Sequence, residues 1–261
     1  MMKYFFTLII GCLALSLHAQ NKAFHADEKL TFTAGYSMSG IMTDFAQITM
    51  ETSTVKTKSA TLLRLKCKAT TYSKWDNYFK IRDLYESYVS PSNITPYLYK
   101  REIDEGGYYK FVKYNFNHKS KTVKSLIRKK SKKSESGFWD TNNTVKIKSE
   151  TRDIVSTLYY LRTLDIKKAS PGDSDTFNVL FDNKETKMSF TYVKKETIST
   201  AIGKKECYKL KISAAGTDAL KGGDNFLWLT ADENKIPVYA KFKIAVGSGE
   251  LKIKSASGLK N

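Results

Sequence analysis

Apolar and polar residues alternate along most of this chain, which predicts β-strands with one buried and one solvated face. In residues 63–69 every odd position is apolar and every even position is basic. A parallel sheet buries both of its faces, so this alternation predicts antiparallel pairing. The same period recurs in residues 30–34, 46–51, 208–212 and 240–244. Turn signals separate these segments at residues 106–107, 171–172, 222–224 and 231–234.

One stretch near the middle of the chain has helical spacing instead. Ile154, Leu158 and Leu161 predict a helix at about 151–164 that presses an apolar stripe onto the sheet. The residues available to cap its first turn are Thr151 and Ser149. Many strands and one packed helix predict a mainly β protein, built as a strongly curved antiparallel sheet or an incomplete β-barrel.

The first twenty residues have the layout of a secretory signal peptide. Lys3 precedes an apolar run over residues 4–17, and Ala19 ends it. We therefore expect residues 1–19 to be removed and residues 20–261 to form a single β-rich domain, since no proline- or serine-rich linker divides them. The alternative is a lipoprotein, because the sequence before Cys12 resembles a lipobox. The apolar run continues past Cys12, which favours simple cleavage.

The chain is strongly basic, with a formal net charge of +18 over 261 residues. For an exported protein the polyanions at hand are lipid head groups and acidic glycans, so we expect no nucleic-acid partner. Residues 106–134 contain no acid. A solvated strand face explains part of this bias, while contact with an anionic membrane surface or an envelope protein is the functional alternative. The candidate contacts are Lys121, Lys124, Arg128, Lys129, Lys130, Lys132 and Lys133.

Catalytic chemistry is sparse in this sequence. His25 and His118 have no further histidine or cysteine at ligand spacing. We expect no metal, no cofactor and no catalytic residue. Cys67 shares a strand face with leucines and Cys207 shares one with lysines, so we expect two free thiols, with a disulfide as the alternative.

Several short motifs resemble the exported bacterial family called Domain of Unknown Function 3108. The motifs lie at residues 79–89, 96–101, 152–162, 203–210 and 236–238. The resemblance implies a mainly β protein of the cell envelope, periplasmic or associated with the outer membrane of a Gram-negative bacterium, with no established activity. The order of strands, helix and late hairpin is also similar to periplasmic lipoprotein carriers, at the level of fold.

These observations favour a protein that binds a lipid or another amphiphile on a curved sheet. Arg82, Asp83 and Tyr85 stand among aromatic residues and could form the polar end of a ligand groove, or a cross-strand charge network. Arg162 could face the ligand from the helix, although an acid early and a base late in a helix also complement its dipole. One alternative is an interaction module without a cavity. A weaker one is a glycan-acting enzyme with paired carboxylates.

Overall fold

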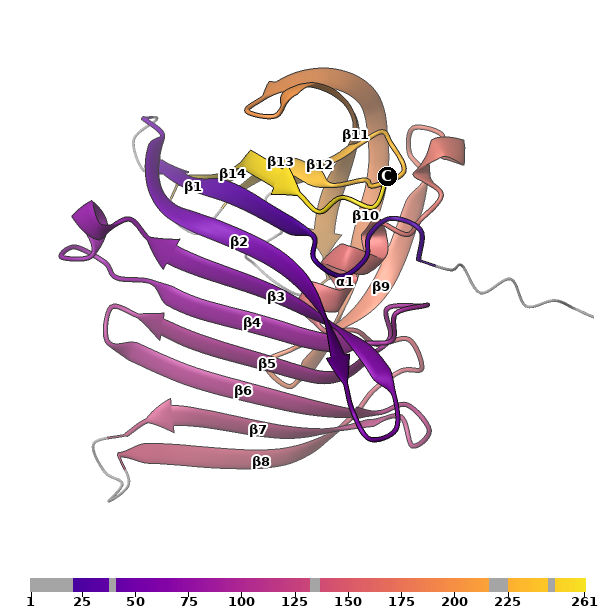
Figure 1. Ribbon diagram of the computed structural model, residues 1–261. Helices are drawn as coiled ribbons and strands as arrows, with labels where there is room; N and C mark the ends of the chain where they lie inside the picture. Colours follow the sequence, from indigo (N-terminus) through magenta and orange to yellow (C-terminus); the bar gives the residue numbers. More distant parts are fainter. Residues whose placement is uncertain (1–20, 38–40, 132–136, 216–224, 244–246) are drawn as a thin grey trace, which may run out of the picture.

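The computed structural model describes residues 21–37, 41–131, 137–215, 225–243 and 247–261. The expected signal peptide with Cys12 lies outside these residues, as do Lys132 and Lys133. Fourteen strands form one antiparallel sheet in the order β8-β7-β6-β5-β4-β3-β2-β1-β14-β13-β12-β11-β10-β9 (Figure 1). Each half of the chain therefore forms a meander, and the pairing of β1 with β14 joins the halves.

The elements have the following bounds. The first half contains β1 (Lys29–Ser37), β2 (Thr43–Lys56), β3 (Thr61–Thr71), η1 (Ser73–Trp75), β4 (Arg82–Val89), β5 (Pro96–Glu105), β6 (Tyr108–Asn117), β7 (Thr122–Lys130) and β8 (Phe138–Lys146). The second half contains α1 (Ile154–Leu161), η2 (Ile166–Lys168), β9 (Ser174–Phe181), β10 (Lys184–Thr200), β11 (Gly203–Ala214), β12 (Phe226–Thr230), β13 (Pro237–Lys243) and β14 (Ser248–Ser257).

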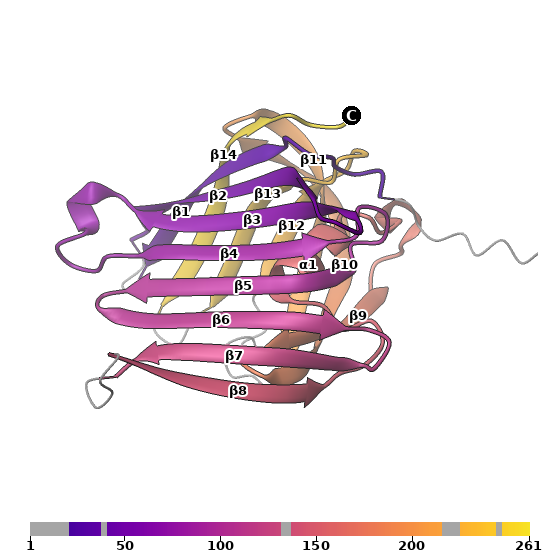
Figure 2. The same cartoon turned by 60° about the horizontal axis from the view of Figure 1, so that its bottom comes forward.

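Within the described residues the sheet curves strongly without closing, and β8 and β9 are its two edges (Figures 1 and 2). The exposed side of β9 is paired by Arg152, whose N–H donates to the Asn178 carbonyl at 2.9 Å and whose carbonyl accepts from the Leu180 N–H at 2.8 Å. This pairing covers part of a strand edge that could otherwise bind another chain. The predicted curved antiparallel sheet with one helix is confirmed.

The helix α1 packs against the concave side of the sheet and contacts β3, β4 and β9 (Figure 2). Its cap is Asp153 rather than Thr151 or Ser149. The Asp153 side chain accepts from the Ser156 N–H at 2.9 Å, and the Ser156 hydroxyl accepts from the Asp153 N–H at 3.1 Å. This reciprocal capping box starts the helix later than the sequence predicted, because it satisfies two N–H groups at once.

The buried face of α1 is also shifted by one position from the predicted stripe. Val155 and Tyr159 are buried, whereas Ile154 is 39% exposed. The prediction was correct for Leu161, which is fully buried. The capping box and the hydrogen bond between Ser87 and Asp153 hold the first turn of this eight-residue helix against the sheet in this orientation.

Both cysteines of the described residues, Cys67 and Cys207, are free, as predicted. Cys67 lies on the concave face of β3, where burial raises the pKa of its thiol to about 12. Cys207 is fully buried although lysines alternate with it on β11, and the neighbouring Tyr208 is buried too. Both faces of β11 are therefore covered at this point.

Candidate functional site

One hydrogen bond identifies which strand residues face α1. The Ser87 hydroxyl donates to Asp153 Oδ2 at 2.6 Å, so residues an even number of positions from Ser87 on β4 point the same way. Asp83 and Tyr85, two of the predicted ligand-binding residues, therefore lie on the concave face. Asp83 lies about 13 Å along the strand from Ser87, toward the end of the sheet remote from α1. We call this the distal end (left in Figure 2).

Arg82, a third predicted residue, points to the convex face. Its guanidinium pairs with Asp76 at 2.5 Å and donates to the Thr71 hydroxyl at 2.9 Å. Glu86 also faces outward and accepts from Arg64 Nε at 2.8 Å. A cross-strand charge network thus exists on the convex face, and Arg82 does not join the other two predicted residues in one site.

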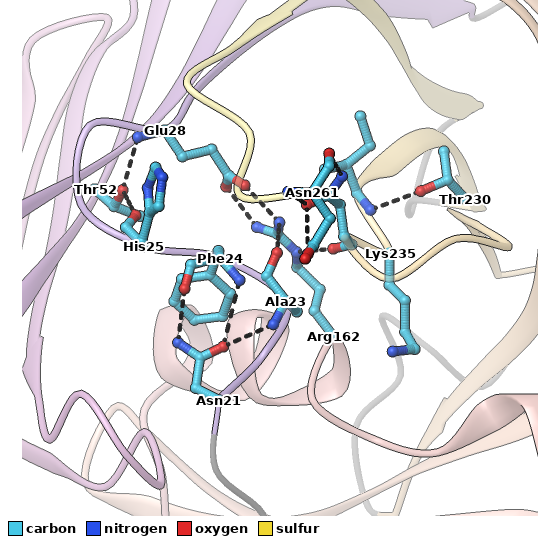
Figure 3. Close-up of polar contacts among 12 residues, drawn as sticks. Asn21, Ala23, Phe24, His25, Glu28, Thr52, Arg162, Thr230, Lys235 and Asn261 are labelled. Carbon is cyan, nitrogen blue, oxygen red and sulfur yellow. Dashed lines mark hydrogen bonds and ion pairs between the residues drawn. The ribbon is translucent and has the colours of Figure 1, made fainter.

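Arg162, the fourth predicted residue, is used inside the fold (Figure 3). Its guanidinium forms a bidentate pair with Glu28, with both contacts at 2.6 Å, and its Nε donates to the Asn234 carbonyl at 3.1 Å. The Phe24 ring lies 4.8 Å from the guanidinium. Both charged side chains are 0% exposed. The pair fastens the end of α1 to the segment leading into β1, whereas Asp83 lies at the distal end.

More charged side chains lie on the concave face near Asp83. The ladder register places Arg101 of β5 and Lys110 of β6 there, and they are 2% and 7% exposed. Both form ion pairs with Asp182, from the turn between β9 and β10, and the Lys110 pair measures 2.7 Å. We call the following residues the interior charged cluster: Asp83, Arg101, Glu105, Lys110 and Asp182.

The carboxyl groups of this cluster are held in different states. Burial raises the pKa of Asp83 to about 7, and the charge of Glu105 adds to this rise against a 3.2 Å hydrogen bond from the Asp104 N–H. Burial alone would also raise the pKa of Asp182, but the two cations of the cluster lower it overall. The cluster therefore combines an ionised carboxylate with a carboxyl that can hold a proton near neutral pH.

The turn between β9 and β10 docks across the concave face. Asp182 and Asn183 have φ values of 47° and 62°, a left-handed backbone that Asp and Asn adopt more readily than most residues. The Asn183 N–H donates to the Tyr114 hydroxyl at 2.9 Å, and the Ser125 hydroxyl donates to Asn183 Oδ1 at 2.5 Å. The turn thereby joins the second half of the chain to β6 and β7.

An apolar cavity of about 660 Å³ opens at the distal end. In its wall, the Trp75 indole N–H donates to the Asp44 carbonyl at 3.0 Å. The Tyr36 and Phe45 rings meet edge to face there, with centroids 6.4 Å apart. We call this cavity the aromatic pocket. Its lining residues are Tyr36, Ile41, Thr43, Phe45, Trp75, Tyr78, Phe79 and Ile81.

The aromatic pocket adjoins the interior charged cluster. Gly106 has a φ of 52°, a left-handed backbone that favours glycine, and it lies against the Phe79 ring, because a Cβ there would be 2.9 Å from this ring. Ile81 pairs with Glu105 through an isolated bridge. Ile81 and Asp83 are two positions apart on one face. The apolar lining of the aromatic pocket therefore continues directly into the interior charged cluster.

The basic residues predicted for an anionic surface do not form one patch. Lys121 lies in the turn before β7 and Lys124 near the start of this strand, whereas Lys129 and Lys130 end it at the distal end. Lys121 and Lys130, the outermost of these, are nine residues apart, which corresponds to roughly 30 Å along the strand. The remaining described member, Arg128, donates to both Asp140 oxygens at 2.7 Å.

Sequence reasoning missed Arg101, Lys110 and most of the aromatic pocket. Arg101 lies between Tyr99 and Ile103 in an alternating segment, so a charge at an inward position was a usable signal. Lys110 follows the same logic between Tyr108 and Val112. The aromatic pocket assembles three separate connections, and only tertiary structure brings them together.

A metal site and a membrane-spanning helix each have requirements that can be checked against the described residues. Among these residues, no three His, Cys, Asp or Glu side chains gather closely enough to hold a metal ion. No helix within the described part of the chain has the length and apolar character needed to cross a membrane.

The fold and site define a β-barrel-like protein whose open, curved sheet carries a buried charged cluster beside an apolar pocket. The chain belongs to the DUF3108 family, described as a protein of unknown function, whose family model matches residues 31–254. A search of curated proteins found no match.

One solved structure has the same type of fold, and two others are more distant matches. A β-barrel-like protein of the domain of unknown function DUF1849 from Brucella abortus is 9% identical, with a TM-score of 0.60 over 90% of this chain and 98% of that one. A protein described as exported, with a YmcC-like fold, from Bacteroides fragilis is 8% identical, with a TM-score of 0.36 over 91% and 99% of the two chains. A protein described as a lipoprotein, from Parabacteroides distasonis, is 8% identical, with a TM-score of 0.36 over 91% and 98%.

Proposed function

We propose that this protein is exported to the cell envelope and binds an amphiphile at the distal end of its curved sheet. The observation that carries this proposal is the aromatic pocket of about 660 Å³, which lies against the interior charged cluster. Ligand sites typically combine an apolar cavity with a few convergent polar groups. The apolar part of the ligand would lie among the rings, and its polar head would reach Asp83 and its neighbours.

The first prediction concerns the pocket wall. Replacing Trp75 or Phe79 with alanine should weaken binding of the uncharged fluorescent probe N-phenyl-1-naphthylamine about tenfold, because each ring supplies apolar contact area to the probe. Phe79 is 53% exposed, so its loss should leave the fold intact. Fluorescence titration of the probe measures the effect.

Tyr97→Ala is the matched control for these variants. Tyr97 is a comparably exposed aromatic residue, at 46%, but it begins β5 at the opposite end of the sheet. Equal losses in all three variants would contradict a site in the aromatic pocket. Absence of probe binding in the unmodified protein would favour the alternative, an interaction module that uses this face for a protein partner.

The rim of the distal end supports a second proposal, contact with an anionic membrane surface. Tyr78, Tyr108 and Trp139 are 82%, 49% and 65% exposed at this end of the sheet, where Lys129 and Lys130 end β7. Trp139 pairs directly with Lys129 across β7 and β8. Aromatic rings together with basic residues are typical of membrane–water interfaces.

We expect the double variant Lys129→Gln/Lys130→Gln to bind phosphatidylcholine–phosphatidylglycerol vesicles at least about tenfold more weakly, since each basic residue near such a surface contributes about 1 kcal/mol. The control is Lys121→Gln/Lys124→Gln, which removes the same charge from the other end of β7. Vesicle co-sedimentation measures both. Binding that does not respond to phosphatidylglycerol content contradicts the proposal.

A glycan-acting enzyme is the weaker alternative. Asp83 and Glu105 are the carboxyl pair that the concave face offers, close enough for Glu105 to raise the pKa of Asp83. Their position beside an aromatic pocket also suits carbohydrate stacking. Binding of an amphiphile is favoured because the lining of the neighbouring pocket is mostly apolar and aromatic.

A further inference from the structure

Two buried cations share one carboxylate in the interior charged cluster. Arg101 and Lys110 are 2% and 7% exposed, whereas the Asp182 side chain that pairs with both is 42% exposed. A buried cation is costly unless it is paired and hydrogen-bonded. The carboxylate that pairs with both cations thus comes from an accessible turn, not from the strands that carry the cations.

Two buried polar atoms at the same place lack a hydrogen-bond partner within the described part of the chain. Arg101 Nε and the Tyr99 hydroxyl are buried and make no hydrogen bond to any described residue. Tyr99 and Arg101 are neighbours on the concave face of β5, and the Phe181 ring lies 4.2 Å from the guanidinium. Buried polar groups are normally satisfied, so unpaired donors beside two cations indicate a place for an anionic acceptor.

The two buried cations, Arg101 and Lys110, are within reach of a molecule held in the aromatic pocket. Asp83 lies on β4 and Lys110 on β6, two strands away, which corresponds to roughly 10 Å. The Asp83 carboxyl, protonated near neutral pH, can donate a hydrogen bond to an anion between them. A short apolar chain in the aromatic pocket would therefore bring its head group to Lys110.

We propose that Arg101 and Lys110 bind the oxyanion head group of the ligand, a phosphate or a carboxylate, and that Asp182 occupies this place in the ligand-free protein. This inference rests on the proposed function and specifies its ligand as an anionic amphiphile. Binding then displaces Asp182 and the two-residue turn that carries it. The turn acts as an internal substitute for the head group, which keeps the two buried cations paired when no ligand is present.

The test is competition against N-phenyl-1-naphthylamine with three probes: dodecyl phosphate, dodecanol and inorganic phosphate. Asp182→Asn retains a residue that tolerates the left-handed backbone of the turn but removes the competing charge. We expect this variant to bind dodecyl phosphate about tenfold more tightly than the unmodified protein, with dodecanol unchanged. Tenfold corresponds to about 1.4 kcal/mol, close to the low end of what a hydrogen bond to a charged group contributes.

Lys110→Gln should weaken the binding of dodecyl phosphate about tenfold and leave the binding of dodecanol unchanged. Lys113→Gln is its matched control, because Lys113 lies on the same strand and faces the convex side. Thermal unfolding of each variant verifies the fold. If Lys110→Gln does not fold, Arg101→Lys replaces it, since lysine keeps the charge but loses the bidentate geometry.

The outcomes separate this proposal from the one it rests on. The head-group site is wrong if Asp182→Asn and Lys110→Gln leave the ratio of the affinities for dodecyl phosphate and dodecanol unchanged. If naphthylamine still binds to these variants, the proposal for the pocket stands. Inorganic phosphate that competes as well as dodecyl phosphate overturns the assignment to an amphiphile. If the unmodified protein does not bind N-phenyl-1-naphthylamine, the proposed function itself is wrong.

Discussion

Replacing Arg162 with methionine should lower the free energy of unfolding by about 3–5 kcal/mol, the usual cost of breaking a buried ion pair. The substitution leaves the Glu28 carboxylate fully buried without its bidentate partner. It also removes the hydrogen bond to the Asn234 carbonyl and the contact with the Phe24 ring. Urea denaturation measures the change.

The double variant Arg162→Met/Glu28→Gln should recover much of this loss, because the buried charge is then absent. Arg128→Met provides the control: its pair with Asp140 has the same bidentate geometry but lies exposed on β7 and β8, so unfolding should barely change. If the Arg128 and Arg162 variants are equally stable, the pair at the end of α1 is not what fastens this helix to the segment leading into β1.

Asp83→Asn should stabilise the protein above pH 7 and leave it unchanged below pH 4. The pKa of Asp83 is raised to about 7 in the folded protein, while in the unfolded chain it is near 3.8. Between these values the unfolded chain releases a proton that the folded protein keeps, so the wild-type protein loses stability as the pH rises. Asparagine cannot ionise, and the gain at pH 8 should be roughly 2–4 kcal/mol.

Urea denaturation at several pH values between 4 and 9 tests this expectation. Glu105→Gln should move the decline to lower pH, because the charge of Glu105 contributes to the raised pKa of Asp83. Asp140→Asn is the control, since hydrogen bonding to Arg128 lowers the pKa of Asp140 and the variant should gain nothing at high pH. A stability difference between Asp83→Asn and wild type that is independent of pH would contradict a protonated Asp83.

Much of the fold could be predicted from local pattern. The alternation at residues 30–34, 46–51, 63–69 and 208–212 correctly gave strands that lie within β1, β2, β3 and β11. The helix was predicted at the correct place, but the predicted segment is too long and its buried face is one position away from the observed one. Its true start depends on the Asp153–Ser156 capping box and on Ser87, a residue 66 positions away from Asp153 in the chain.

Half of the predicted ligand-binding set came together. Asp83 and Tyr85 share the concave face, while Arg82 and Arg162 form partners elsewhere. Alternation alone shows that Arg82 and Asp83 face opposite sides of a strand. It does not show which side is the inside of the curve, because aromatic residues flank both.

The antiparallel strands, the helix near the middle of the chain, the basic character and the free thiols of Cys67 and Cys207 could be predicted from the sequence, because they follow from periodicity, composition and strand face. Long-range pairing could not: β1 pairs with β14, Arg162 meets Glu28 across 134 positions, and Asp182 reaches Arg101 across 81. Such partners are selected by how a twisted sheet curves around its helix. That curvature is a property of all fourteen strands together, and no local segment encodes it.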